Sequence, residues 1–162
     1  MKIGVLSIVA VFFGAIFWAV GGHEIQSHAS FYWHKLTGKT VTLEINGYKI
    51  EAEIARSSSE RQKGLSGREE LGKNKGMIFV FEKEDLYSFW MKEVNFPLDI
   101  IWIKGDTIVG LKEKVPVETG PEYTPYLPPE PVDKVLEVAG GWAEKHGVKA
   151  GQKVIFSREL SP

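Results

Sequence analysis

The chain has 162 residues, of which 43% are hydrophobic and 12% aromatic, and this is enough for one domain with a sizeable core. The formal net charge of -1 argues against nucleic acid as a partner, because binding to phosphates normally needs a basic face. The absence of cysteine excludes disulfides, thiolate nucleophiles and cysteine metal sites. The fold must therefore be stabilised by packing alone.

The first apolar run covers residues 3–22 and contains no charged side chain. As a helix rising about 1.5 Å per residue, this run would match a hydrocarbon core of roughly 30 Å. A secretory signal usually has an apolar region of only about 7–15 residues, so residues 1–22 are predicted to be a retained single-pass membrane anchor. Cleavage of an export signal after Gly21 or Ala29 is the alternative. Both interpretations place the globular part outside the cytoplasm, at the cell membrane or secreted, and the charge rule keeps Lys2 inside.

Residues 23–38 are interpreted as a juxtamembrane linker. Its aromatic residues 31–33 would lie at the lipid headgroups or pack onto the domain. Its histidines, His23, His28 and His34, do not have the spacing of helical or zinc-finger ligands. We therefore expect no metal site there.

Residues 39–162 are predicted to form a single mainly-β domain, a sandwich or barrel of mostly antiparallel strands with one or two short helices. A hairpin opens it, because apolar and polar residues alternate in residues 41–45 and 50–54. The intervening Asn46 and Gly47 both tolerate the positive φ of a tight hairpin turn. One face of this hairpin should be buried and the other solvated.

A short helix is predicted after the hairpin. Ser57 can cap its first turn, and Glu60 three residues later completes a capping box. Gly64 and Gly67 mark its end.

Three apolar runs follow, at residues 77–81, 89–91 and 98–103. They are rich in aromatic and β-branched residues and too short for ordinary helices, so they are predicted to be adjacent strands of one sheet. An acidic turn at residues 82–85 and a corner at residues 95–97 would join them.

The run 98–103 organises the predicted fold. Its alternating side chains are apolar on both faces, apart from Asp99, so the strand should be covered on both sides and lie in the middle of the sheet.

The remaining elements are a strand at residues 107–115, a strand at 132–138, a short helix at 142–146 and a last strand at 153–156. Residues 116–131 hold six of the eight prolines of the chain, which excludes a helix or a central strand there. This segment is predicted to be an extended lid.

Three ordered signatures resemble a known family. The first is ERQKGL from residue 60, with Arg68, Leu71 and GMIFVF from residue 76. The second is FWMK from residue 89 with PLDI from residue 97, and the third is VLEV from residue 135 with GGWAEKHGVKAG from residue 140. Together they resemble the domain-of-unknown-function family 192, DUF192, over residues 41–154.

The resemblance implies mainly an architecture, a compact β-sandwich or barrel with one or two short helices, often behind an export signal or anchor. It implies no established reaction, cofactor or substrate. One departure is Glu93, because members of the family usually have asparagine at that position.

Four polar residues lie inside or beside the apolar signatures, and these are the proposed ligand-binding residues: Arg61, Arg68, Lys92 and Asp99. A carboxylate on a doubly covered strand needs hydrogen-bond donors or a cation, so Arg68 or Lys92 is the expected partner of Asp99. One interpretation is a buried ion pair that holds the helix against the sheet. The other is a small polar pocket for an anionic or hydroxylated ligand, with Arg61 and Arg68 as neighbours on one helical face.

Aromatic residues offer a second kind of site, because exposed rings can bind sugars. Tyr123, Tyr126 and Trp142 are the possible contacts, although packing is the preferred role even for these. Trp90 and Trp102 are expected in the core.

Few residues of the sequence suggest enzyme chemistry. A glycosidase needs two carboxyl groups flanking a cleft, and Asp99 with Glu137 is the only pair that we would nominate. The domain has one histidine, His146, and it lacks a serine elbow, a phosphate loop and a Rossmann fingerprint. We therefore expect no catalytic residue and no cofactor.

The sequence thus favours a membrane-tethered extracytoplasmic binding or interaction module, whose partner would be carbohydrate or another envelope protein. A hydrolase acting on extracellular or envelope polysaccharide is one alternative. A structural accessory of a membrane complex is the other.

Overall fold

The computed structural model describes residues 39–160, which belong to one compact unit. Its elements in this range are β1 (Thr40–Ile45), β2 (Tyr48–Ala55), α3 (Ser58–Lys63), β3 (Lys75–Asp85), β4 (Leu98–Lys104), β5 (Thr107–Val115), β6 (Val132–Ala139), α4 (Trp142–Lys145) and β7 (Val154–Phe156). The predicted anchor and linker, residues 1–38, lie outside the described residues. No helix in the described range is both long and apolar enough to span a bilayer.

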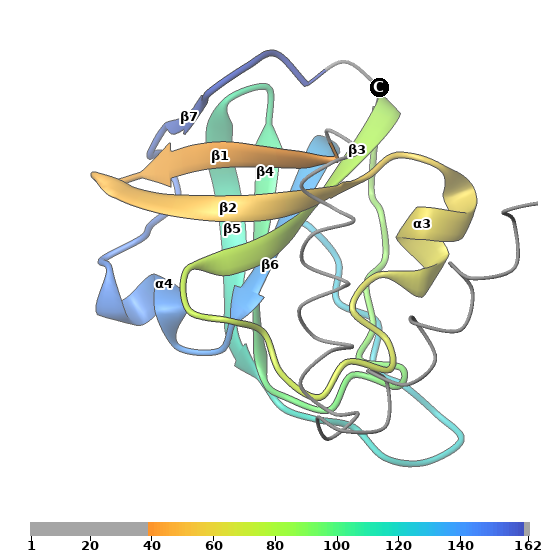
Figure 1. Cartoon of the computed structure of the whole chain (residues 1–162). Coiled ribbons are helices and arrows are strands. Elements are labelled where there is room, and N and C mark those ends of the chain that lie inside the picture. The colour runs from red at the N-terminus through yellow and green to blue at the C-terminus, as the bar shows by residue number, and fades with distance from the viewer. Residues whose placement is uncertain (1–38, 161–162) are drawn as a thin grey trace, which may run out of the picture. The chain divides into compact units, whose positions relative to one another are not determined.

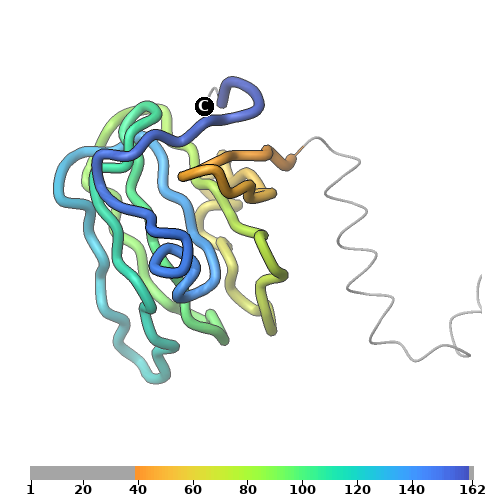
Figure 2. The backbone as a smooth tube through the Cα atoms, turned by 90° about the vertical axis from the view of Figure 1, so that its left-hand side faces the viewer, coloured from red at the N-terminus to blue at the C-terminus, as the bar shows by residue number. Residues whose placement is uncertain are grey.

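The strands form one curled, mixed sheet in the order β5-β4-β6-β3-β2-β1-β7. All neighbours are antiparallel except β2 and β3. Figure 1 shows β1 and β2 running across the direction of β4 and β5. The sheet curls until its two ends meet, where Thr107 forms a bridge with Lys153, and Figure 2 shows the blue C-terminal segment against the β4–β5 hairpin. The prediction of a mainly-β, mostly antiparallel fold with two short helices is confirmed.

Local sequence chemistry explains the first hairpin and the first helix. Asn46 and Gly47 have φ values of 52° and 83°, as the β1–β2 turn requires. The Ser57 hydroxyl accepts the Glu60 N–H at 3.2 Å, and the Glu60 carboxylate accepts the Ser57 N–H at 3.0 Å. Both the predicted hairpin and the predicted capping box are therefore confirmed.

The predicted strand at residues 89–91 is instead a single bridge. Phe89 exchanges two backbone hydrogen bonds with Tyr126 of the proline-rich lid, at 2.9 and 2.8 Å. To extend this antiparallel pairing, the next hydrogen bonds would need the N–H groups of the lid residues two positions before and after Tyr126. Pro128 has no N–H, and the N–H of Thr124 is donated to a carboxylate of the lid itself.

The predicted adjacency of β3 and β4 is also wrong, because β6 lies between them and is antiparallel to both. The connection between β3 and β4, residues 86–97, is too long for a tight hairpin, so β4 need not pair with β3. The later strand β6 pairs with β3 instead. The acidic residues predicted as a turn, 82–85, are the exposed end of β3.

Two hydrophobic clusters cover the two faces of the sheet. The inner cluster takes residues from all seven strands and from α4. The outer cluster combines residues of β3, β4 and β6 with residues of the α3–β3 and β3–β4 connections. β4 contributes Ile101 and Ile103 to the inner cluster and Leu98, Ile100 and Trp102 to the outer one. The prediction of a central strand that is buried on both faces is confirmed.

Candidate functional site

Asp99 of β4 is fully buried and is held by backbone amides. Its carboxylate accepts hydrogen bonds from the N–H groups of Lys114 at 2.7 Å, Gly141 at 2.9 Å and Ala143 at 2.7 Å. Gly141 and Ala143 belong to the first turn of α4, whose cap residue has no side chain. Asp99 therefore supplies, from another strand, the acceptor that a capping side chain would normally provide.

The third donor comes from an irregularity in β5. Leu98 pairs with Val115, whereas Ile100 pairs with Lys112, so β5 has one extra residue opposite Asp99. Lys114, within this bulge, has a φ of 50°. Its N–H points to the Asp99 carboxylate.

The expected ion pair between Asp99 and Arg68 or Lys92 is wrong. Arg68 instead binds Glu53 through two hydrogen bonds of 2.5 and 2.8 Å, and Lys92 is exposed. Three amide donors, from the β5 bulge and the first turn of α4, take the place of the expected cation. Arg61 and Arg68 do not share a helical face, because α3 ends at Lys63.

The candidate site is a different feature, an open hollow of about 360 Å³ between α3 and residues 87–90. Its aromatic lining consists of Phe79, Phe81, Tyr87, Phe89 and Trp90, and its polar side chains are those of Ser58, Arg61, Gln62, Lys63, Ser66, Ser88 and Glu137. We call this the α3 hollow.

The aromatic rings of the α3 hollow hold one another in place. The Phe81 and Tyr87 rings are stacked with centroids 3.5 Å apart, and Phe79 meets Phe89 edge to face at 4.9 Å. Trp90 differs from them, because 47% of it is exposed. The expectation that Trp90 lies in the core is wrong, whereas Trp102 is buried as expected.

Glu137 of β6 is the acidic group of the α3 hollow, and only 4% of it is exposed. Burial disfavours the charged form and raises the pKa of this carboxyl to about 8, against a smaller opposing effect of the Arg68 charge. Its side chain makes no hydrogen bond to another residue within 39–160. At neutral pH the group is therefore protonated and can donate and accept a hydrogen bond.

Asp99 and Glu137 do not form a glycosidase pair. In the β4–β6 register, Asp99 lies opposite Val138 and Ile100 lies opposite Glu137. The two carboxyl groups therefore project from opposite faces of the sheet. The pattern that singled out Asp99, an acid within an apolar run, also marks Glu137 at residues 135–138.

Two of the four proposed ligand-binding residues lie at this region. Arg61 lines the α3 hollow, with its guanidinium 5.0 Å from the Phe81 ring centroid and bonded to the carbonyls of Arg56 and Val80. Lys92 lines an adjoining hollow that shares Trp90 with the first.

The predicted aromatic contacts are elsewhere. Trp142 is buried in the inner cluster. Tyr126 packs on the outer cluster and donates its hydroxyl to Glu118 at 2.9 Å. Tyr123 is half-buried in the lid, and none of these three residues lines the α3 hollow.

The family model of DUF192, described as "Uncharacterized ACR", matches residues 41–156. The chain belongs to the DUF192 family. This confirms the resemblance seen in the three sequence signatures. No curated protein matches the chain.

Two solved structures share the DUF192 fold of this chain. One is a protein of unknown function from Novosphingobium aromaticivorans, with 35% identity, a TM-score of 0.62, and coverage of 72% of this chain and 83% of that one. The other is a protein from Sinorhizobium meliloti described as a candidate transcription regulator, with 26% identity, a TM-score of 0.68, and coverage of 73% of this chain and 94% of that one.

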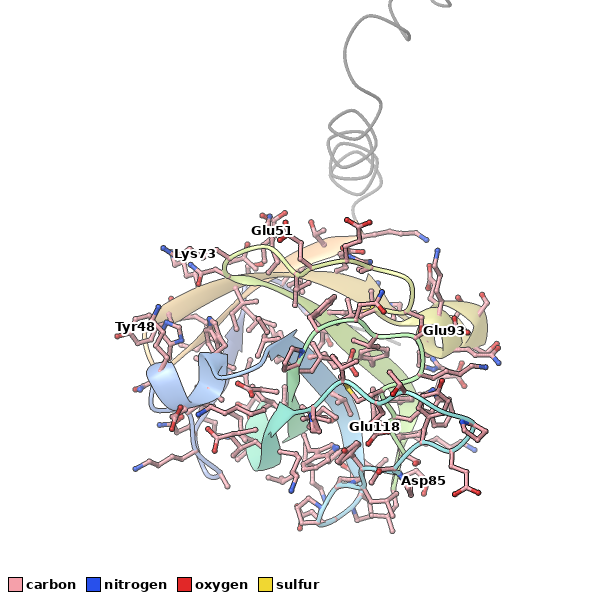
Figure 3. All side chains as sticks on the ribbon, turned by 90° about the horizontal axis from the view of Figure 1, so that it is seen from below. Tyr48, Glu51, Lys73, Asp85, Glu93 and Glu118 are labelled. Atoms are coloured by element: carbon pink, nitrogen blue, oxygen red, sulfur yellow. The ribbon has the colours of Figure 1, made fainter. Side chains whose placement is uncertain are left out.

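The backbone at position 93 favours the asparagine that the family resemblance implies there. Glu93 has a φ of 57°, and its carbonyl accepts the Gly67 N–H at 2.8 Å. Figure 3 shows Glu93 beside α3. Asparagine tolerates this left-handed conformation better than glutamate does.

Glu93→Asn is therefore expected to raise the free energy of unfolding by about 0.5–1 kcal/mol, measured by urea unfolding. Glu69→Asn is the control, because Glu69 is exposed but does not have a positive φ. Equal effects of the two substitutions would contradict the backbone explanation.

Proposed function

We propose that this DUF192 domain is a non-catalytic binding module whose ligand occupies the α3 hollow. The observation that carries the proposal is a buried, protonated Glu137 in an open hollow with aromatic walls. Binding sites typically combine such apolar walls with a few polar groups that orient the ligand.

The lining favours a neutral, hydroxylated ligand, and we propose a carbohydrate. Protonated Glu137 can both donate to and accept from a sugar hydroxyl, and Ser58, Gln62 and Ser66 add further polar groups. The half-exposed Trp90 ring offers an apolar surface to the face of a sugar ring. The Arg61 guanidinium already binds backbone carbonyls, so Lys63 is the remaining cation of the lining.

A polysaccharide hydrolase is the weaker reading of the same hollow. Hydrolysis of a glycosidic bond needs a second carboxyl group as nucleophile or base, and Glu137 is the one carboxyl group among the residues that line the α3 hollow. Nothing comparable supports a nucleic-acid role, because the formal net charge is -1. We therefore do not extend to this chain the description of the S. meliloti protein as a candidate transcription regulator.

We further propose that residues 3–22 tether the domain to the cell membrane, outside the cytoplasm. The support is the uncharged apolar run in the sequence. Cell fractionation should place the full chain with the membranes, and deletion of residues 3–22 should release it. If expression of the full chain instead yields a shorter, soluble product, a cleaved leader would be favoured.

Trp90→Ala tests the binding proposal. Tryptophan fluorescence of the full chain should change saturably with at least one of a panel of gluco-, manno- and galacto-oligosaccharides. Trp90→Ala, followed by calorimetry, is expected to weaken that binding roughly tenfold or more, or about 1.4 kcal/mol, since the stacking surface is lost.

Leu127→Ala is the matched control, because Leu127 is an exposed apolar residue of the lid outside the α3 hollow. It should bind as the unsubstituted chain does. The proposal fails if no oligosaccharide gives a saturable change, or if Trp90→Ala binds with unaltered affinity.

A further inference from the structure

A second hollow, of about 450 Å³, lies at the other helix. It is lined by Tyr48, Leu71, Gly72, Lys73, Asn74, Lys75, Ala139, Gly140, Gly141, Trp142, Lys145 and His146. Figure 3 shows Tyr48 beside α4 and Lys73 toward the same side. We call it the α4 hollow, and it shares no lining residue with the α3 hollow.

The charge of the α4 hollow has one sign. Three lysines and one histidine line it, and no carboxylate does. Lys75 is paired with Glu51 at 2.6 Å. Lys73 and Lys145 form no ion pair with any residue of the described range, so their charges remain uncompensated there.

Two acids beside the α4 hollow have partners of their own. The Asp99 carboxylate below Gly141 is occupied by three backbone N–H groups. Glu144 of α4 is paired with Lys114 at 2.6 Å. Neither Asp99 nor Glu144 therefore needs a lysine of the α4 hollow as its partner.

His146 is held in a defined orientation inside the α4 hollow. Its ring lies between Tyr48, at a centroid distance of 4.3 Å, and Trp142, at 4.4 Å. Its Nδ1 is 2.7 Å from the Trp142 carbonyl oxygen. A carbonyl oxygen only accepts, so Nδ1 carries the proton, and Nε2 is left to bind a ligand.

We infer that the α4 hollow is a binding site for a phosphate-bearing small molecule. Lys73 and Lys145 supply the uncompensated positive charge and the charge-assisted N–H donors for the phosphate oxygens, and the His146 ring lies in the same hollow. A phosphate group carries about -1.5 to -2 charges at neutral pH, which matches the charges of the two lysines better than the single charge of a carboxylate ligand would. The site is independent of the carbohydrate site proposed above.

Titration of the full chain with inorganic phosphate tests this site. The His146 imidazole resonances, assigned by their loss in His146→Gln, should shift and saturate at millimolar phosphate. In the double variant Lys73→Ala, Lys145→Ala, the dissociation constant should rise at least tenfold. Sodium chloride at equal ionic strength should not reproduce the shift.

A double variant Lys49→Ala, Lys149→Ala is the control, because both lysines are exposed and neither lines the α4 hollow. It removes the same total charge and should leave the dissociation constant unchanged. Absence of a saturable shift overturns the inference, and so does an equal loss of affinity in both double variants. Thermal unfolding of each variant verifies that the fold is intact.

Discussion

Replacing Asp99 by alanine is expected to lower the free energy of unfolding by about 3–5 kcal/mol. The substitution leaves three N–H groups without their acceptor, the buried one of Ala143 and the part-buried ones of Lys114 and Gly141. Each such group costs about 1–3 kcal/mol when water cannot reach it. Urea unfolding of the full chain, followed by circular dichroism, measures the effect.

Asp99→Asn preserves the shape of the side chain and is expected to cost about 2–4 kcal/mol, because the amide nitrogen then faces an N–H donor. Asp106→Asn is the control, since Asp106 is exposed and pairs with Lys153 at 2.6 Å. Exposed pairs contribute about 0–1 kcal/mol. A loss of less than about 1 kcal/mol in Asp99→Asn would show that the carboxylate does not hold β5 and α4 against β4.

Glu137 is expected to make the domain less stable as pH rises from 5 to 9. Its pKa is about 8 in the folded chain against the ordinary 4.5 of a glutamate side chain, so the unfolded state releases the proton first. Stability is then full below pH 4.5, falls as pH rises toward 8, and is level above it. The loss should be on the order of 4 kcal/mol.

Glu137→Gln should abolish most of this pH dependence, because glutamine stays neutral while keeping both hydrogen-bonding functions. Urea unfolding of both chains at a series of pH values measures it. Glu60, whose pKa is lowered to about 2, changes the free energy of unfolding only at acidic pH. It therefore does not contribute to the change expected between pH 5 and 9. A parallel pH dependence in the two chains would be incompatible with a buried, protonated Glu137.

The same pair of chains connects stability with the proposed function. Ligand binding by the unsubstituted chain should weaken above pH 8, where Glu137 loses its proton and can no longer donate. Glu137→Gln should retain binding in that range. Because the α4 hollow does not include Glu137, phosphate binding there should be the same in both chains.

Features encoded by neighbouring residues were predictable. Asn46 and Gly47 adopt the positive φ values of a tight turn, and Ser57 with Glu60 forms a capping box. The two-faced burial of β4 also followed from its composition, because side chains of a strand alternate between faces whatever the strand order is.

Features that depend on distant backbone were not predictable. The expected cation beside Asp99 is replaced by amides from a bulge in β5 and from the first turn of α4. Apolar composition also placed Trp90 in the core, but it is half-exposed in the structure. A sequence shows that a side chain is apolar, but not whether another segment covers it.

The sequence by itself determined the mainly-β class, the family, the first hairpin, the first helix and the doubly buried strand, because turn chemistry, capping and alternation act over a few residues. Only the tertiary structure decided that β6 separates β3 from β4 and that Glu137 and Asp99 face opposite sides of the sheet. Strand order and register bring together residues that are far apart in the chain, and the two hollows exist only where those residues meet.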